Sequence, residues 1–167
     1  MLRPLNNANT FIGAIFFLCA IGVAYADQPR LFFHDSLNEM EMTYAGEPFL
    51  LSVWSMECPP CFEELKLLGK LREEYPKFNV ILISADSPDL IDEAERFLVQ
   101  FNLSGVNSWV YGSNRSDQLR YAIDPRWYGE MPRSYFYNKD GARTSVSGLL
   151  SEDVLKRWIV ATSDAKF

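Results

Sequence analysis

The chain has 167 residues with 16 Lys and Arg against 22 Asp and Glu, a formal net charge of −6, and a hydrophobic content of 48%. This composition is typical of a globular protein and excludes a disordered chain, a collagen-like repeat and a disulfide-dense mini-protein. The negative charge argues against a nucleic-acid partner, because binding along a phosphate backbone needs a basic surface. Since His34 is the only histidine, a Ser-His-Asp triad or a histidine-rich metal site lacks its residues. We predict no metal site and expect the chemistry in cysteines or carboxylates.

The first 26 residues have the features of a secretory signal peptide. An uncharged run from Phe11 to Val23 is followed by Ala24-Tyr25-Ala26, the small-x-small pattern that a signal peptidase reads. We expect cleavage after it and a location outside the cytoplasm, such as the periplasm. An uncleaved membrane anchor is the alternative, although the apolar run through Ala26 has 16 residues and a span needs roughly 20. The rest is expected to be one domain, with an N-terminal extension, 27–46, and a main region, 47–167.

A strand followed by a helix occurs twice in the first half of the main region. Pro48 to Ser55 is a short apolar run typical of a fully covered strand, and apolar residues at helical spacing predict a helix from Pro59 to Tyr75. The same order returns with a buried strand at Asn79–Ala85 and an amphipathic helix at Pro88–Phe101. A β-α-β-α order implies neighbouring parallel strands. In the extension, an edge strand is predicted at Leu31–Phe33.

The second half predicts an antiparallel addition to this sheet. A third strand at Ser108–Tyr111 and a short helix at Asp117–Ile123 come first. Two further strands, Ser134–Tyr137 and Arg143–Ser147, are separated by a segment whose Asp-Gly pair is a strong hairpin signal. A last helix starts at Ser151 with acidic residues in its first turn. The sequence therefore predicts an α/β fold with a mixed central sheet and helices on both faces.

Two cysteines in the sequence Cys58-Pro59-Pro60-Cys61 lie where the first buried strand gives way to a helix. A helix N-terminus stabilises a thiolate through unpaired backbone N–H groups and the helix dipole, so Cys58 is predicted to be the attacking sulfur. Cys61, one turn later, is placed to resolve a mixed disulfide. The prolines fix the turn and donate no N–H. A bridge that closes so short a loop adds little stability, so we expect a redox pair and not a structural staple.

The motif WSMECPPC before an amphipathic helix, the later Met131-Pro132 before a strand, and the closing hairpin and helix resemble the thioredoxin fold. With the export signal and the helix sequence CFEEL, the chain most resembles the TlpA/ResA branch of thiol-disulfide oxidoreductases. The resemblance implies an exported enzyme that reduces disulfides in protein clients, with a membrane thiol reductase as electron donor. Its redox group would be the Cys58–Cys61 disulfide itself, with no other cofactor.

The resemblance also implies roles for other residues. In that family a cis-proline faces the disulfide and the residue before it pairs its backbone with the client, which assigns substrate binding to Met131 and Pro132; Met131 as an ordinary core methionine is the alternative. Glu64 lies one helical turn after Cys61 and matches a family glutamate that tunes the cysteines or moves protons. A carboxylate at that position is suited to accept the Cys61 proton, particularly if burial raises its pKa.

Three residues are predicted to tune the cysteine pair: Glu57, Pro59 and Pro60. The family often has Trp before the first cysteine, and Glu57 occupies that position in this chain. Its negative charge disfavours the Cys58 thiolate, and strong oxidants are those whose thiolate is heavily stabilised. We therefore expect the Cys58–Cys61 pair to have a low reduction potential, as in a protein that reduces disulfides.

Other interpretations remain open. A Cu(I) binding or delivery module on the same fold would use Cys58, Cys61 and Met56 as soft ligands, although no histidine follows His34. An inert disulfide in a binding domain and a peroxiredoxin are further alternatives. Trp127 and Tyr128 are either packed or part of a client-binding rim. The acidic run from Asp86 to Glu95 is expected to be a solvated helix face and not a calcium site.

Overall fold

The computed structural model describes residues 28–162, and their strands form one mixed sheet in the order β1-β4-β3-β2-β5-β6. The predicted signal peptide lies outside the described residues. β1 to β4 are parallel to one another, whereas β5 is antiparallel to β2 and β6 is antiparallel to β5. The strands are β1 (Arg30–Phe32), β2 (Phe49–Trp54), β3 (Val80–Ser84), β4 (Asn107–Tyr111), β5 (Arg133–Tyr137) and β6 (Arg143–Ser147).

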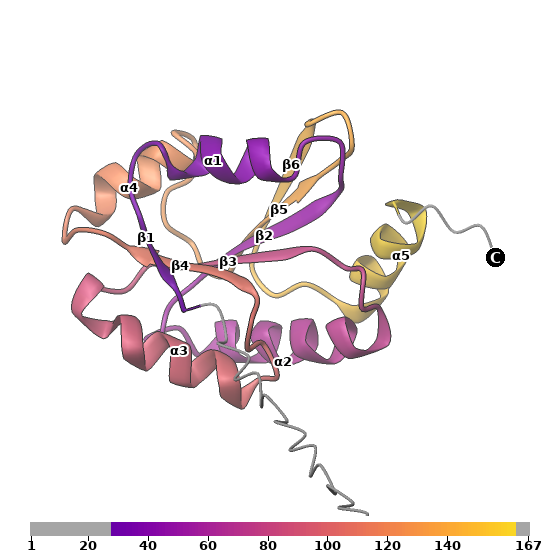
Figure 1. The fold of residues 1–167 in the computed structure, drawn as a ribbon, viewed down its shortest axis with the longest axis horizontal. Coiled ribbons are helices and arrows are strands. Elements are labelled where there is room, and N and C mark those ends of the chain that lie inside the picture. Colours follow the sequence, from indigo (N-terminus) through magenta and orange to yellow (C-terminus); the bar gives the residue numbers. More distant parts are fainter. Residues whose placement is uncertain (1–27, 163–167) are drawn as a thin grey trace, which may run out of the picture.

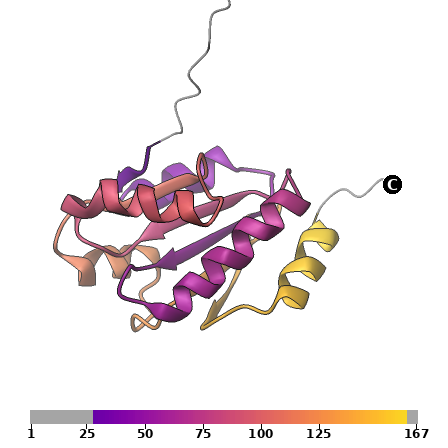
Figure 2. The same ribbon diagram turned by 90° about the horizontal axis from the view of Figure 1, so that it is seen from below.

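Helices cover both faces of this sheet (Figure 1). The helices are α1 (Ser36–Thr43), α2 (Pro59–Glu74), α3 (Ile91–Gln100), which follows the 3-10 turn η1 (Pro88–Leu90), α4 (Ser116–Ile123) and α5 (Glu152–Thr162). Helices α1 and α4 lie on one face, and α2, α3 and α5 pack on the other; Figure 2 shows α2 and α3 in front of the strands and α5, in yellow, beside them. Within residues 28–162, no helix combines the length and the apolar character needed to cross a membrane.

Two hydrophobic cores follow from the alternation of side chains along the central strands. Leu50 and Trp54 of β2 join the core under α2, α3 and α5, whereas Leu51 and Val53 face the core under α1 and α4. All six residues of β2 are buried, as expected for a strand covered on both faces. The apolar run that predicted this strand therefore reflects double coverage.

Close packing of α2 against the end of α3 depends on a glycine. A Cβ atom built at Gly69 would lie 1.8 Å from the carbonyl oxygen of Phe101. Only a residue without a side chain lets the two backbones approach so closely. This contact helps to fix α2, the helix that carries both cysteines.

The predicted α/β fold and its mixed sheet are confirmed, and the predicted strands agree with the structure to within one or two residues. The expected edge strand is β1, which pairs with β4. Helix α1 was not predicted, because its eight residues show no clear period. Residues 28–46 of the predicted extension pack against the main region, since Phe32 and Met40 are buried in the core under α1 and α4.

Candidate active site

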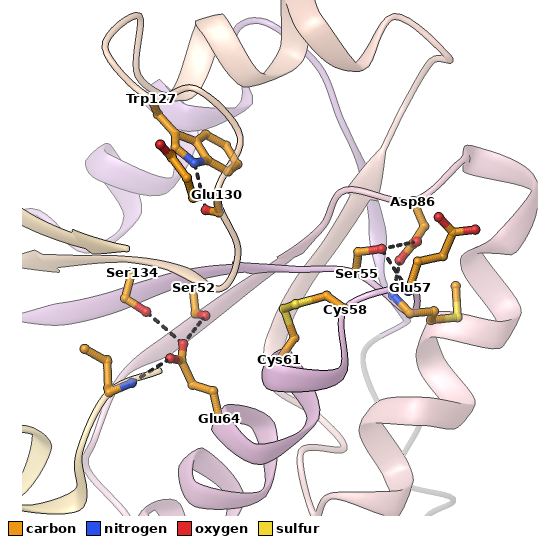
Figure 3. The surroundings of a disulfide bond; sticks show 12 residues. Ser52, Ser55, Glu57, Cys58, Cys61, Glu64, Asp86, Trp127, Glu130 and Ser134 are labelled. Atoms are coloured by element: carbon orange, nitrogen blue, oxygen red, sulfur yellow. Dashed lines mark hydrogen bonds between the residues drawn. A yellow bond between two sulfur atoms is a disulfide. The ribbon is translucent and has the colours of Figure 1, made fainter. Parts of the chain in front are cut away.

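The two cysteines lie where β2 leads into α2. Cys58 is the N-cap of the helix, and its sulfur is bonded to that of Cys61 across a Cα–Cα distance of 5.3 Å (Figure 3). Cys58 is 8% exposed and Cys61 is 0% exposed. A sulfur in solution therefore reaches Cys58 first, and Cys61 is accessible only from within the protein.

The backbone N–H groups at the start of α2 are already hydrogen-bonded, whereas the sequence predicted them to be unpaired. The N–H of Cys61 is bonded to the carbonyl of Cys58 at 2.9 Å, and the N–H of Cys58 is bonded to the carbonyl of Ser55 at 3.1 Å. Pro59 and Pro60 carry no N–H. The expectation that unpaired N–H groups here stabilise a Cys58 thiolate was wrong for these positions, and only the helix dipole remains as a general effect.

Three residues next to Cys58 in the sequence are exposed: Glu57, Pro59 and Pro60. The Glu57 carboxylate has no hydrogen-bond or ion-pair partner among residues 28–162. Its charge lies next to the reachable cysteine in the sequence, but water and salt screen an exposed charge. We therefore expect its influence on the cysteine pair to be modest.

Glu64 is 1% exposed and lies between α2 and the sheet. Its Oε1 atom accepts hydrogen bonds from Ser52 Oγ at 2.7 Å and Ser134 Oγ at 2.8 Å, and its Oε2 atom accepts one from the Leu150 N–H at 3.3 Å. Burial raises the pKa of Glu64 above its ordinary value, although these bonds act in the opposite direction. Figure 3 shows the carboxylate directed at the two serines.

The sequence did not identify the serine partners of Glu64. Ser52 and Ser134 occupy paired positions of β2 and β5. Ser52 stands in an apolar strand, and a polar residue in a buried strand needs a partner, so a signal was present. The partner itself depends on the register of two strands that are far apart in the chain.

The Met131–Pro132 peptide bond is cis, as the resemblance implies. Pro132 is buried, and half-buried Met131 packs against both cores, one of which contains the two cysteines. Within residues 28–162, neither the N–H nor the C=O of Met131 has a hydrogen-bond partner. Met131 is therefore packed, as the alternative interpretation expects, and its role in binding a client remains a prediction.

The segment before the cis-proline is held in place from two sides. The indole N–H of Trp127 donates to the carbonyl of Glu130 at 2.9 Å, and Arg120 donates to the carbonyl of Trp127. Trp127 is 2% exposed, whereas Tyr128 is 88% exposed. Trp127 is thus a packed residue, and only Tyr128 remains available for a client-binding rim.

An ion pair supports the other end of this segment. Asp124 accepts hydrogen bonds from the Arg126 N–H at 3.0 Å and from Arg133 Nη2 at 3.3 Å. Burial acts to raise the pKa of Asp124, but these bonds and the neighbouring arginines hold it below its ordinary value. Arg133 directly follows the cis-proline, so the pair ties both ends of the loop together.

The prediction for the acidic run from Asp86 to Glu95 fails at one residue, Asp86. Asp86 is buried at the end of β3, where it accepts a hydrogen bond from Ser55 Oγ at 2.8 Å. The prediction of a solvated helix face was therefore wrong for Asp86, although Asp89, Asp92 and Glu93 are exposed. Across residues 28–162, no three His, Cys, Asp or Glu side chains are grouped so that they would hold a metal ion.

No family model matches the chain. Over 126 residues it is 28% identical to the thiol-disulfide oxidoreductase ResA of Halalkalibacterium halodurans, which covers 74% of this chain and 64% of ResA. Over 66 residues it is 35% identical to the thiol:disulfide interchange protein DsbE of Haemophilus influenzae, covering 40% of this chain and 34% of DsbE. The chain thus spans less than two thirds of either relative.

Solved structures support the thioredoxin fold that the sequence predicts. A secreted Mycobacterium tuberculosis disulfide oxidoreductase that is homologous to DsbE superposes with a TM-score of 0.56 at 22% identity, covering 72% of this chain and 85% of that one. StoA of Bacillus subtilis superposes with a TM-score of 0.52 at 20% identity, covering 70% and 85%. Together the comparisons support the thioredoxin fold, and the sequence is similar to the thiol-disulfide oxidoreductases ResA and DsbE.

Proposed function

We propose that this protein is an exported thiol-disulfide oxidoreductase that reduces disulfides in client proteins. The observation that carries the proposal is the disulfide at the start of α2, in which Cys58 reaches the surface and Cys61 does not. The names of the two sequence relatives, thiol-disulfide oxidoreductase and thiol:disulfide interchange protein, support the same chemistry.

The reaction starts from the reduced pair. The Cys58 thiolate attacks one sulfur of a client disulfide, the client S–S bond breaks, and the leaving client thiolate takes up a proton. Cys61 then loses its proton and attacks the Cys58 sulfur, which releases the second client thiolate and forms the Cys58–Cys61 disulfide. Two electrons pass to the client, and a dithiol donor restores the pair by the reverse steps.

Glu64 is the residue that we assign to the Cys61 proton. Burial raises the pKa of its carboxyl group, which makes the carboxylate a better proton acceptor than an exposed glutamate. Oε2 holds only one hydrogen bond, the longest of the three, so it is the oxygen that is easiest to protonate. Glu64 lies one helical turn after Cys61 on α2, and we propose that the proton passes from Cys61 to its carboxylate.

Met131 and Pro132 form the client-binding element of the proposal. The unpaired N–H and C=O of Met131 offer a backbone hydrogen-bonding edge to an extended client segment. Pro132 has its own carbonyl bonded to the Gly148 N–H at 2.8 Å, which holds the loop against the end of β6. The client is thus read through its backbone, which suits an enzyme that accepts protein disulfides in general.

The pair is expected to be reducing. Glu57 places a negative charge beside Cys58, and the residues around the motif leave few backbone donors for a thiolate. Export rests on the signal-like sequence of the first 26 residues. Outside the cytosol the dithiol needs an electron supply, so a membrane thiol reductase is the proposed donor, and the cysteine pair is the proposed redox group.

Insulin reduction tests the proposal. Dithiothreitol should reduce insulin several-fold faster with the wild-type protein than without it, and Cys58→Ser should return the rate to background. Cys61→Ser should trap client proteins as mixed disulfides through Cys58. A wild-type protein that leaves the rate unchanged but binds Cu(I) tightly through both cysteines would contradict the proposal and favour copper delivery.

A further inference from the structure

Asp86 lies beside the turn that carries Cys58. β2 and β3 are parallel, and their last residues, Trp54 and Ser84, are paired. The chain beyond β3 therefore runs next to the turn beyond β2, and the Ala85 N–H donates to the Trp54 carbonyl at 2.8 Å. Figure 3 shows the Asp86 carboxylate against Ser55, at the start of this turn.

Both oxygens of the Asp86 carboxylate are used as acceptors. Oδ1 accepts from Ser55 Oγ at 2.8 Å, and Oδ2 accepts from the Met56 N–H at 3.0 Å and from Ser84 Oγ. Each serine oxygen also accepts a backbone N–H, Ser55 from Glu57 and Ser84 from Asp86, so each hydroxyl proton is left to point at the carboxylate. An arrangement with three donors and no acceptor fits an ionised carboxylate.

This network takes up the backbone donors that precede Cys58. The Met56 N–H ends on Asp86, and the Glu57 N–H ends on Ser55 Oγ, which Asp86 orients. The Cys58 N–H ends on the Ser55 carbonyl, and the Cys61 N–H ends on the Cys58 carbonyl. Since both intervening residues are prolines, no N–H from Met56 to Cys61 is free to bind a thiolate.

We propose that Asp86 sets the redox balance of the Cys58–Cys61 pair by holding a buried negative charge beside the turn that carries Cys58. This inference rests on the proposed function. The charge disfavours the Cys58 thiolate and leaves the neutral thiol unaffected. In the exchange with glutathione, the protein disulfide and two glutathione molecules give the protein dithiol and one glutathione disulfide. The charge therefore shifts this equilibrium toward the protein disulfide. Asp86 is a positioning residue, because it acts through Cys58.

Asp86→Asn tests the inference because the amide keeps the shape of the carboxylate and removes the charge. The pH at which reduced Cys58 is half-alkylated by iodoacetamide should fall by about half a unit to one unit. The glutathione equilibrium constant should rise about threefold or more near pH 9, where thiolates dominate, and less than twofold near pH 7, where the thiols are protonated. Glu93→Gln, which removes an exposed charge of α3, should change neither quantity.

The pH dependence separates an electrostatic role from a structural one. A loosened turn would change the equilibrium to the same extent at both pH values, and that result would overturn the proposal, as would an Asp86→Asn protein that matches the wild type. Ser55→Ala keeps the charge and should shift the alkylation midpoint by less than half as much. If neither Asp86→Asn nor Asp86→Ala gives the wild-type far-UV circular dichroism spectrum, the role is structural and the proposal fails. A wild-type pair that does not exchange with glutathione would instead refute the proposed function.

Discussion

Ser134 Oγ lies 2.8 Å from Glu64 Oε1, and this hydrogen bond joins the helix that carries both cysteines to the strand that follows the cis-proline. Glu64 thereby holds together the two parts of the proposed site, the redox pair and the client-binding loop. The cost is a buried carboxylate, whose charged form is disfavoured by desolvation. Such a residue is expected to affect stability and catalysis in opposite directions.

Glu64→Gln should stabilise the protein at neutral pH. The pKa of Glu64 is raised above its ordinary value of 4.5, so its ionisation costs stability as pH rises from 4.5 through the folded-state pKa. Glutamine keeps an oxygen for the two serines and carries no charge. The free energy of unfolding of the variant, measured by urea denaturation, should exceed that of the wild type near neutral pH, and the gap should narrow near pH 4. A gap that widens toward acidic pH would contradict the raised pKa.

The same variant should be a slower enzyme if Glu64 accepts the Cys61 proton. Loss of a general base typically costs a factor of 100 or more, and water replaces part of that effect, so we expect resolution of the mixed disulfide to slow at least about tenfold. The rate of Cys58 alkylation in the reduced protein should change little. Stopped-flow reduction of a fluorescent disulfide peptide would measure the resolution step, and an unchanged rate would remove Glu64 from the mechanism.

Asp124→Asn should destabilise the protein by about 1–3 kcal/mol, because Arg133, whose side chain is 13% exposed, would lose its carboxylate partner. The pKa of Asp124 lies below its ordinary value of 3.8, so its stabilising effect is complete above 3.8 and is lost as pH falls through the folded-state pKa. Thermal unfolding from neutral to acidic pH should show the wild-type advantage shrinking at the acidic end. Equal melting temperatures at pH 7 would show that the ion pair contributes nothing.

Tyr128→Ala and Trp127→Ala should separate client binding from packing. Tyr128 is 88% exposed, so its loss should change the free energy of unfolding by less than about 0.5 kcal/mol. Loss of Trp127, which is 2% exposed, should cost about 3–5 kcal/mol. If Tyr128 belongs to a client-binding rim, its variant should raise the KM for a peptide disulfide and leave kcat unchanged. An unchanged KM would exclude the rim.

Gly69→Ala should destabilise the protein even though alanine is favoured in helices by about 1 kcal/mol. The added Cβ would collide with the carbonyl oxygen of Phe101, at 1.8 Å, and α2 and α3 would have to separate. Urea denaturation would measure the loss, with Lys66→Ala at an exposed position of α2 as the control. A stabilised Gly69→Ala protein would show that the two helices are not packed this closely.

The sequence predicted the parts of the fold that depend on local patterns. β2 and β3 are covered on both faces, and their apolar runs show this directly. The position of the cysteines between a strand and a helix followed from the same pattern and is confirmed. Helix α1 escaped prediction because it is short, and only Ser36 and Met40 of its eight residues are buried.

The surroundings of the site depend on contacts between distant segments, which the sequence does not show. Asp86 looked like one more charge of a solvated acidic run, and it is buried because the parallel ends of β2 and β3 bring it against Ser55. Ser52 and Ser134 meet Glu64 only because β5 pairs with β2 in one register. The helix N-terminus suggested free donors, and the turn geometry uses them internally. The assigned roles of Cys58, Cys61, Glu64 and Met131 remain predictions.

The reduction potential of the Cys58–Cys61 pair tests the central claim most directly. The full chain, equilibrated in a series of glutathione redox buffers and then alkylated, should show one two-electron transition at a potential closer to that of thioredoxin, about −270 mV, than to that of DsbA, about −120 mV. Cys58→Ser and Cys61→Ser should abolish the transition. A pair that stays fully oxidised or fully reduced across all buffers, or a potential at the DsbA end, would contradict the account.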